Sequence, residues 1–279
     1  MRKRMSYRAG HVNVVVALSC EAKPLIKHFN LKRTSDRAGF KVYENDQDIT
    51  LIVSGMGKIA MATACGYLAG LQNNSRLSKS AWLNMGIAGH QHAPIGKLLL
   101  VHKVTDSERD NVFYPPLLLD IDCETTDLIS VDTPETEYID NSAYDMEGSA
   151  FYSTASRFVT SELVQVVKIV SDNSDQSAEH VTESKIQGWV RENLKLIVDI
   201  VEQLLSMSAE YQSIYSPSNE FQELADKVYL TSSQQVQLKR LVRRYHALGG
   251  TELHNRLKPE CYKSAKSVIN SLTLLVEAI

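Results

Sequence analysis

The sequence predicts an α/β protein with a mixed central sheet flanked by helices, followed by a small all-helical C-terminal extension. Over residues 11–206, short apolar and β-branched runs alternate with helix-like segments, which is typical of strand–helix–strand units. From about Ser206 the strand-like runs stop and helical patterns follow. We therefore divide the chain into a sheet domain over residues 11–206 and a helical extension over residues 207–279.

Composition places the chain among ordinary globular proteins. Its 279 residues are 43% hydrophobic and 23% charged, with a net charge of −3, which gives no general attraction to nucleic acids or membranes. The four cysteines are widely spaced without a Cys-x-x-Cys pair, so they fit neither a disulfide framework nor a zinc site, and a reducing cytoplasm is expected. The histidines do not group at ligand spacing either, so we expect no metal and no organic cofactor.

The first strand is expected at Val12–Leu18, and a helix is expected from Pro24, a residue suited to a first turn. The apolar run is too short for a signal peptide or a membrane span. Glu21 lies between strand and helix. A carboxylate there either stabilises the helix N-terminus electrostatically or belongs to a site, and both interpretations stay open at this point.

An antiparallel pair is expected at Phe40–Tyr43 and Ile49–Val53. The segment Ser54–Ala60 contains two glycines and opens a small-residue helix that runs to Leu71. Glycines between a strand and a helix leave backbone N–H groups free for an anion or a polar ligand. The spacing is neither the Walker nor the Rossmann one, so this signal is weak by itself.

The middle of the chain continues the sheet. Ala81–Met85 is predicted to be a strand, and the Gly86–His90 turn that follows either lets the backbone approach a flat ligand closely or is simply a tight turn. Lys97–Val104 is predicted to be a further strand and Leu128–Val131 a short one. Residues 105–127 between them are expected to form an irregular surface loop.

Two carboxylates in the next segments are candidates for chemistry. Glu147 lies among small and apolar residues before a helix that runs to about Phe158, where an unpaired carboxylate would be costly. A sugar diol would be a suitable partner, although a surface carboxylate at a helix start gives the same pattern. Asp172 follows the apolar run Glu162–Val170, and polar groups at the carboxyl end of a buried strand are the usual place for chemistry in such sheets.

The last part of the chain is predicted to be helical. Trp189–Leu205 has one apolar face and is expected to pack on the sheet. Tyr211–Glu220 is predicted to be a linker. Helices are expected at residues 221–229, 233–248 and 262–277, and the middle one carries a basic face, which is either solvated or a contact for nucleic acid. This face consists of Lys239, Arg240, Arg243 and Arg244.

Five sequence islands, taken in order, resemble the nucleoside phosphorylase superfamily, and within it the 5′-methylthioadenosine/S-adenosylhomocysteine nucleosidases. The resemblance covers roughly residues 11–206 and none of the extension. It implies a phosphorylase/hydrolase-like fold. The islands are Val14–Leu25 with Glu21, Ser54–Lys58, Asn84–Gly89, Asp145–Gly148 and Val170–Asp175.

The resemblance also implies roles for the carboxylates. Asp172 falls where the family's general acid protonates the purine at N7, so that the glycosidic bond breaks through an oxocarbenium-like transition state. Glu147 falls where the ribose hydroxyls are bound and positive charge is stabilised. Glu21 falls where the attacking water is held and activated. The remaining matched positions are assigned to substrate binding: Met146 at the ribose, Ala88 and Gly89 beside the base, Ser171 directly before the acid, and Ile87 and Lys168.

Hydrolysis is favoured over phosphorolysis. Bacterial phosphorylases of this superfamily carry Arg and Ser where this chain has Asn84 and Ile87, and neither replacement can clamp a phosphate. Two further differences concern the nucleosidases themselves. Lys168 stands in place of an Arg, and the segment before Met146 is shorter than usual. Residues 131–134 are expected near the base, without an aligned aromatic residue to stack on it.

Three functions follow as hypotheses. The first is hydrolysis of the N-glycosidic bond of an adenine-type nucleoside, which includes nucleosides modified at the 5′ position. The second is a phosphate-dependent phosphorylase that uses Lys58 or Lys168. The third is a nucleoside-binding or scaffold protein without turnover. The resemblance also implies a homo-oligomer, most simply a homodimer.

Overall fold

The computed structural model describes residues 10–35, 39–45, 48–72, 77–215 and 219–279. The chain divides into two compact units, Met1–Ser213 and Ile214–Ile279. The boundary expected at residues 206/207 lies inside a long helix, so the division falls further along the chain. We describe each unit by itself.

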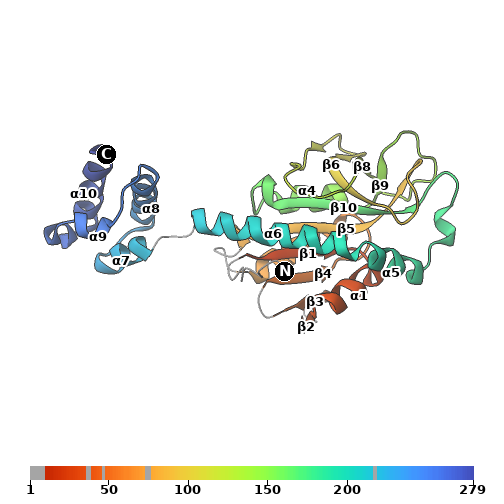
Figure 1. The fold of residues 1–279 in the computed structure, drawn as a ribbon, viewed down its shortest axis with the longest axis horizontal. Coiled ribbons are helices and arrows are strands. Elements are labelled where there is room, and N and C mark those ends of the chain that lie inside the picture. The colour runs from red at the N-terminus through yellow and green to blue at the C-terminus, as the bar shows by residue number, and fades with distance from the viewer. Residues whose placement is uncertain (1–9, 36–38, 46–47, 73–76, 216–218) are drawn as a thin grey trace. The chain divides into compact units, whose positions relative to one another are not determined.

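The first unit is built on one mixed sheet with helices packed on it (Figure 1). Among the described residues its strands are β1 (Val12–Val16), β2 (Lys32–Ser35), β3 (Lys41–Glu44), β4 (Ile49–Val53), β5 (Ala81–His90), β6 (Leu98–Asp106), β7 (Val112–Phe113), β8 (Thr125–Ser130), β9 (Ala143–Asp145) and β10 (Val164–Asp172). Its helices are α1 (Ser19–His28), α2 (Lys58–Leu71), α4 (Gly148–Ala155), α5 (Glu183–Glu192) and α6 (Leu194–Tyr215). The predicted α/β class with a mixed, helix-flanked sheet is confirmed.

Part of this sheet closes on itself. Strand β5 pairs with β1, β9 and β10, while β10 also pairs with β6, and β6 leads back to β9 through β8. Because β1, β5 and β10 are parallel, their carboxyl ends meet at the same edge of the sheet. Strand β9 runs antiparallel to β5, and its first residues pair with the last residues of that strand, so β9 lies at this edge too. A site assembled from strand ends is therefore built into the topology.

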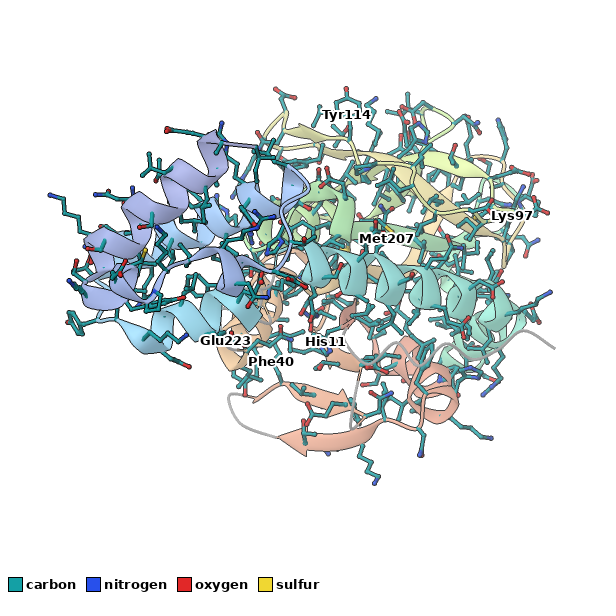
Figure 2. The ribbon with its side chains drawn as sticks, turned by 60° about the vertical axis from the view of Figure 1, so that its left-hand side comes forward. His11, Phe40, Lys97, Tyr114, Met207 and Glu223 are labelled. Carbon is teal, nitrogen blue, oxygen red and sulfur yellow. The ribbon has the colours of Figure 1, made fainter. Side chains whose placement is uncertain are left out.

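Apolar side chains between the sheet and the helices form the core of this unit. Helix α6 crosses the strands β5 and β1 in Figure 1 and buries Ile197, Ile200 and Leu204 in that core. Met207, further along α6, packs against the same cluster and is labelled in Figure 2. Helices α1 and α5 pack on each other, as do α2 and α4. The apolar face predicted over Trp189–Leu205 packs on the sheet, but the segment is not one helix, because α5 ends at Glu192 and α6 begins at Leu194.

A bulge ends the pairing of β10 with β5. Val170 is opposite Ala88 and Asp172 is opposite Gly89, so Ser171 is an extra residue on β10. A bulge bends the strand locally and changes the direction of the side chains around it. Asp172, the last residue of β10, is therefore presented by an irregular strand end.

Several elements differ from the sequence prediction. Helix α1 begins at Ser19, because the Glu21 carboxylate accepts the N–H of Leu18 and starts the helix early, so Pro24 lies inside it. Residues 105–127 are not wholly irregular, since they include β7 and the start of β8. Tyr211–Glu220 is not wholly a linker either, because α6 continues to Tyr215; residues 216–218 lie outside the described part of the chain.

The second unit is a small helical body with its own core. Its helices are α7 (Asn219–Lys227), α8 (Ser232–Ala247), α9 (Leu253–Arg256) and α10 (Ala265–Glu277). Thr231 caps α8 and Ser264 caps α10 by accepting backbone N–H groups. Side chains such as Leu238 and Leu272 are fully buried between these helices. The predicted all-helical extension is confirmed.

Within the described residues, we find no helix that combines the length and the apolar composition needed to cross a membrane.

The separate core of the second unit gives a first prediction. Leu272 is 0% exposed, so Leu272→Ala removes buried methyl groups and should cost about 2–5 kcal/mol of that unit's free energy of unfolding. Urea denaturation followed by far-UV circular dichroism should show helical signal lost at lower urea. The tryptophan fluorescence transition should not move, since Trp82 and Trp189 both lie in the first unit.

The matched control is Leu274→Ala, which changes the same residue type on the same helix at a position that is 67% exposed. It should leave both transitions in place. An equal shift of the tryptophan transition by Leu272→Ala would show that the two units unfold together.

Candidate active site

A cavity of about 170 Å³ lies at the shared edge where β1, β5, β9 and β10 end. All the site residues predicted from the sequence, except Lys168, line it. Its wall includes Glu21 from α1, Ile87, Ala88 and Gly89 from β5, Met146 and Glu147 after β9, and Ser171 and Asp172 from β10. The topology therefore brings together residues that are far apart in the sequence.

Glu21 is held by two backbone donors. One carboxylate oxygen, Oε2, accepts the N–H of Leu18 at 2.7 Å, and the other, Oε1, accepts the N–H of Ile87 at 3.1 Å. The residue is 1% exposed, and this burial raises the pKa of Glu21 to about 7, against the opposing effects of these N–H groups and of Lys168. The two interpretations left open by the sequence both describe it, because Glu21 caps α1 and also lines the cavity.

Glu147 precedes α4 and reaches back to the glycine turn before α2. Its Oε1 accepts the N–H of Gly57 at 2.6 Å, at a residue with a φ of 92°, where a side chain would be strained. The N–H of Gly57, a backbone donor expected to bind a ligand, thus binds the Glu147 carboxylate of the protein itself. Burial raises the pKa of Glu147, and the neighbouring Asp145 charge adds to this, while Lys168 opposes it.

Asp172 is buried at the end of β10, and both of its oxygens have partners. Oδ1 lies 2.5 Å from the hydroxyl of Ser171, which is also 3.2 Å from the carbonyl oxygen of Ala88. Oδ2 accepts a hydrogen bond from the hydroxyl of Tyr138. These contacts fix the carboxyl group against the Ala88–Gly89 end of β5.

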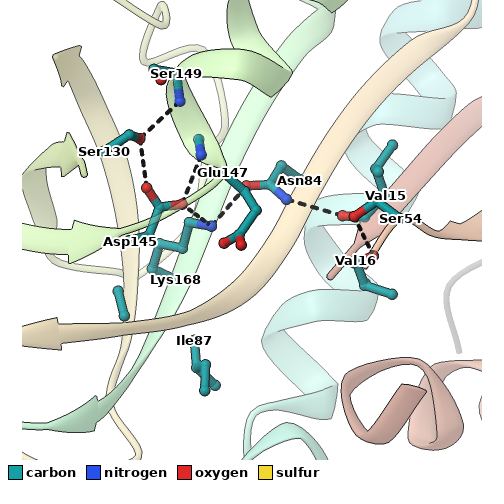
Figure 3. Close-up of polar contacts among 12 residues, drawn as sticks. Val15, Val16, Ser54, Asn84, Ile87, Ser130, Asp145, Glu147, Ser149 and Lys168 are labelled. Carbon is teal, nitrogen blue, oxygen red and sulfur yellow. Dashed lines mark hydrogen bonds and ion pairs between the residues drawn. The ribbon is translucent and has the colours of Figure 1, made fainter. Parts of the chain in front are cut away.

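Lys168 lies behind the cavity wall, in a buried polar network (Figure 3). Its side chain is 1% exposed, and Nζ is 2.7 Å from Asp145 Oδ2 and donates to Asn84 Oδ1 at 2.8 Å. Asp145 also accepts from the hydroxyl of Ser130 at 2.6 Å and from the N–H of Gly148 at 2.8 Å. Each oxygen of this buried carboxylate is therefore satisfied.

Gly86 lets this network approach Glu21. A Cβ at this position would lie 3.3 Å from both Glu21 Oε1 and Lys168 Nζ, which is closer than side-chain carbons normally come to polar atoms. Any larger residue would push the two charged groups aside. The sequence predicts a turn at Gly86–His90, but β5 continues to His90 because its last residues pair with β9 and β10, so Gly86 lies inside the strand and serves the packing of charged side chains behind the cavity wall.

Two residues of the site had no role in the sequence analysis. Tyr138 comes from the loop between β8 and β9, and its ring packs so closely on Gly89 that a methyl group there would overlap it. Asp145 was part of a quoted motif, but its pairing with Lys168 could not be read from a linear pattern. The sequence could have indicated Tyr138, because it is an aromatic residue in the shortened segment and lies close to residues 131–134, which are expected near the base. Val131 and Pro134 of that range line the cavity.

A larger cavity of about 430 Å³ adjoins the first and shares Met56 and Val131 with it. Lys58, at the start of α2, and Arg109 are cations in its wall. Lys58 Nζ is 3.0 Å from Asp106 Oδ1 and 2.8 Å from Asp132 Oδ1. Within the part of the chain that the structure describes, no group of three or more His, Cys, Asp or Glu residues is arranged to hold a metal ion.

Comparisons with known proteins agree with this fold. No protein-family model and no curated protein sequence matches the chain. Among solved structures, futalosine hydrolase of Helicobacter pylori strain 26695 has a TM-score of 0.59 at 15% identity, covering 71% of this chain and 100% of its own. Identity this low shows the fold alone.

Two 5′-methylthioadenosine/S-adenosylhomocysteine nucleosidases are similar in the same way. That of Campylobacter jejuni gives a TM-score of 0.55 at 14% identity, covering 72% of this chain and 99% of that one. That of Colwellia psychrerythraea 34H, solved in complex with adenine, gives 0.57 at 19% identity, covering 72% and 98%. The resemblance drawn from the sequence motifs is thus confirmed at the level of structure.

The buried ion pair gives the second prediction. Lys168→Ala leaves Asp145 buried without its cation and should cost about 3–5 kcal/mol of the free energy of unfolding. The control Lys103→Ala breaks the pair with Asp127, whose two side chains are 36% and 32% exposed, and should cost about 1 kcal/mol or less. Urea denaturation followed by tryptophan fluorescence measures both. Equal costs for the two variants would contradict a structural role for Lys168.

Proposed function

We propose that the chain is a purine nucleoside N-glycosidase that hydrolyses the N-glycosidic bond of an adenine-type nucleoside, including nucleosides modified at the 5′ position. The observation that carries the proposal is the meeting of three buried carboxylates, Asp172, Glu21 and Glu147, around one cavity. They are the acid, the base and the sugar-binding group that such a hydrolysis needs.

The proposed reaction includes two proton transfers, one to the departing base and one from the water that attacks the sugar. Protonated Asp172 donates its proton to N7 of the base, which leaves with the electron pair of the C1′–N9 bond. Glu147 binds the ribose hydroxyls and favours the positive charge that develops on the sugar. Glu21, as a carboxylate, takes a proton from the water whose oxygen attacks C1′. The products are free base and free sugar, and both carboxyl groups then exchange protons with solvent.

The electrostatics of Glu21 support its role as the base. A general base works best when its pKa lies near the working pH, and burial raises the pKa of Glu21 to about 7. The N–H groups of Leu18 and Ile87 hold both oxygens in place, so the side chain is oriented before substrate binds. Lys168 lies close enough to oppose a further rise.

The surroundings of the cavity support water as the nucleophile. A phosphate would need cations or donors that are not already engaged. Both lysines considered for a phosphate site are paired with carboxylates, Lys58 with Asp106 and Asp132, and Lys168 with Asp145. The side-chain amide of Asn84 donates to the carbonyl of Val15 and accepts from Lys168, so it too has partners.

The similar structures lend further support. They are a futalosine hydrolase and several 5′-methylthioadenosine/S-adenosylhomocysteine nucleosidases, one of them holding adenine. The two nucleosidases are consistent with a hydrolase that acts on an adenine-type nucleoside. The homodimer and the cytoplasmic location stay predictions. The basic face of α8, where Arg240 and Arg244 are exposed, fits the solvated face that its composition favours over nucleic-acid contact.

The third prediction concerns activity. Incubation with methylthioadenosine, 5′-deoxyadenosine, adenosine or inosine in phosphate-free buffer should release free base, detected by chromatography. Asp172→Asn removes the acid and should lower kcat about 10²–10⁴-fold. The control Asp175→Asn changes an exposed carboxylate in the turn after the same strand and should leave kcat unchanged.

Two results would change this assignment. Base release that requires phosphate and yields a sugar 1-phosphate would identify a phosphorylase. Tight binding of an adenosine analogue by the wild-type protein, with no base released from any of the four nucleosides, would identify a binding protein without turnover.

The fourth prediction concerns pH. Because Glu21 must be a carboxylate to accept a proton, and its pKa is raised from 4.5 to about 7, the rising, acidic limb of the kcat/KM profile should be centred near pH 7. Glu21→Gln should lower kcat/KM and remove this acidic limb. Measurement over a series of overlapping buffers tests it. An acidic limb centred near 4.5 would show that the base is not the buried Glu21.

A further inference from the structure

The loop over residues 131–142, between β8 and β9, turns one aromatic side chain into the cavity. Tyr138 is 9% exposed, although its neighbour Ile139 is 86% exposed. Val131, Pro134 and Glu135 from the same loop also line the cavity. The Tyr138 side chain therefore points into the cavity although residue 138 belongs to no helix or strand.

Tyr138 lies where the proposed function needs the base to lie. Its hydroxyl donates to Asp172 Oδ2, and its ring covers the backbone of Gly89 so closely that a methyl group there would overlap it. Tyr144 stands beside it, with ring centroids 5.5 Å apart. Asp172 and Gly89 are the proton donor and the backbone expected beside the base, so the tyrosine makes contacts that a purine would make.

The hydroxyl and a bound base compete for one oxygen. Asp172 Oδ1 is engaged by Ser171 at 2.5 Å, and Oδ2 by Tyr138. A carboxyl group that transfers a proton to N7 must direct an oxygen at that nitrogen, and Tyr138, a residue of the cavity wall, holds Oδ2. Burial and the Asp172 charge raise the pKa of Tyr138, so it remains a neutral donor at physiological pH.

The Tyr138 side chain and a bound base also compete for space. The cavity of about 170 Å³ falls below the roughly 300–1,000 Å³ of pockets that enclose drug-sized ligands, a class that includes nucleosides. The Tyr138 ring fills the part of the cavity wall between Gly89 and Asp172. Moving it aside would enlarge the cavity on the side of the proton donor.

We propose that Tyr138 occupies the base subsite of the protein and leaves Asp172 when a purine binds, so that Oδ2, which accepts from the tyrosine hydroxyl, takes up a proton from solvent and donates it to N7 of the base. This proposal rests on the proposed function and names the residue that controls entry of the base. A base that makes this exchange must have a flat face for Gly89 and a nitrogen that can bind the carboxyl group. Purines with a free N7 meet both requirements.

The loop can release the side chain while its backbone stays anchored. The Gln91 side chain donates to the Tyr138 carbonyl oxygen at 3.0 Å. Asp140 accepts from the Tyr144 hydroxyl and from the N–H of Ser142, both at 3.0 Å. These contacts hold the loop backbone at Tyr138 and just after it, so rotation of the Tyr138 side chain is enough for the exchange.

The first test measures binding of free adenine by isothermal titration calorimetry. Tyr138→Phe keeps the ring but removes the hydroxyl that competes for Asp172, so the Kd for adenine should fall about tenfold, the smaller end of the range for a hydrogen bond to a charged group. The control Tyr114→Phe makes the same change at a side chain that is 67% exposed and lies on the surface in Figure 2. It should leave the Kd unchanged. An equal or higher Kd for Tyr138→Phe would overturn the proposal.

The second test follows the tyrosine itself in the otherwise unchanged protein. After incorporation of 3-fluorotyrosine, the fluorine resonance that is missing from Tyr138→Phe belongs to Tyr138. Saturating adenine should shift this resonance. Binding of adenine without any shift would overturn the exchange while leaving the proposed function intact. Failure of the wild type and of both variants to bind adenine would contradict the proposed function and the exchange together.

Discussion

The ion pair between Lys168 and Asp145 is the interaction on which the cavity edge of the sheet depends. It joins β10 to β9, and the contact of Lys168 with Asn84 ties both strands to β5, so the charged group lies inside the closed part of the sheet. A buried cation of this kind is tolerated only when its partners are in place. The charge of Lys168 also reaches Glu21 and Glu147, and it limits the rise of the pKa of each. Lys168 thus acts electrostatically on three carboxylates around the site, those of Asp145, Glu21 and Glu147.

Burial and fixed hydrogen bonds explain why these carboxylates suit proton transfer. Glu21 caps α1 and receives the N–H of Ile87, so no reorganisation is needed to orient it. Glu147 is held in the same way by Gly57. Groups positioned by backbone donors in a dry environment act on developing charge more strongly than the same groups in water. The backbone of strand ends and helix starts therefore provides the preorganisation, and the side chains provide the chemistry.

Local patterns were sufficient to predict the end of β10, but not the end of β5, which continues to His90, nor the contacts between the strands. The apolar run before Asp172 is long and β-branched, so both β10 and the position of Asp172 at its end follow from the sequence. The strand β9 is only 3 residues long and is stabilised by its neighbours β5 and β8, which no local signal reveals. Pairing of Lys168 with Asp145 and of Glu147 with Gly57 likewise depends on tertiary structure. Motif resemblance located these residues without showing their partners.

The inward turn of Tyr138 follows from the same requirement that shapes the rest of the site. A carboxyl group placed to protonate a base must be buried beside an apolar surface, and buried polar atoms without partners are costly. When no base is present, Asp172 Oδ2 would lack a partner unless the protein supplied one. A backbone donor could not withdraw, whereas a side chain from a loop can. A tyrosine hydroxyl satisfies the acid in the empty site and its ring covers Gly89, so the contacts that stabilise the unliganded protein are those that a purine must replace.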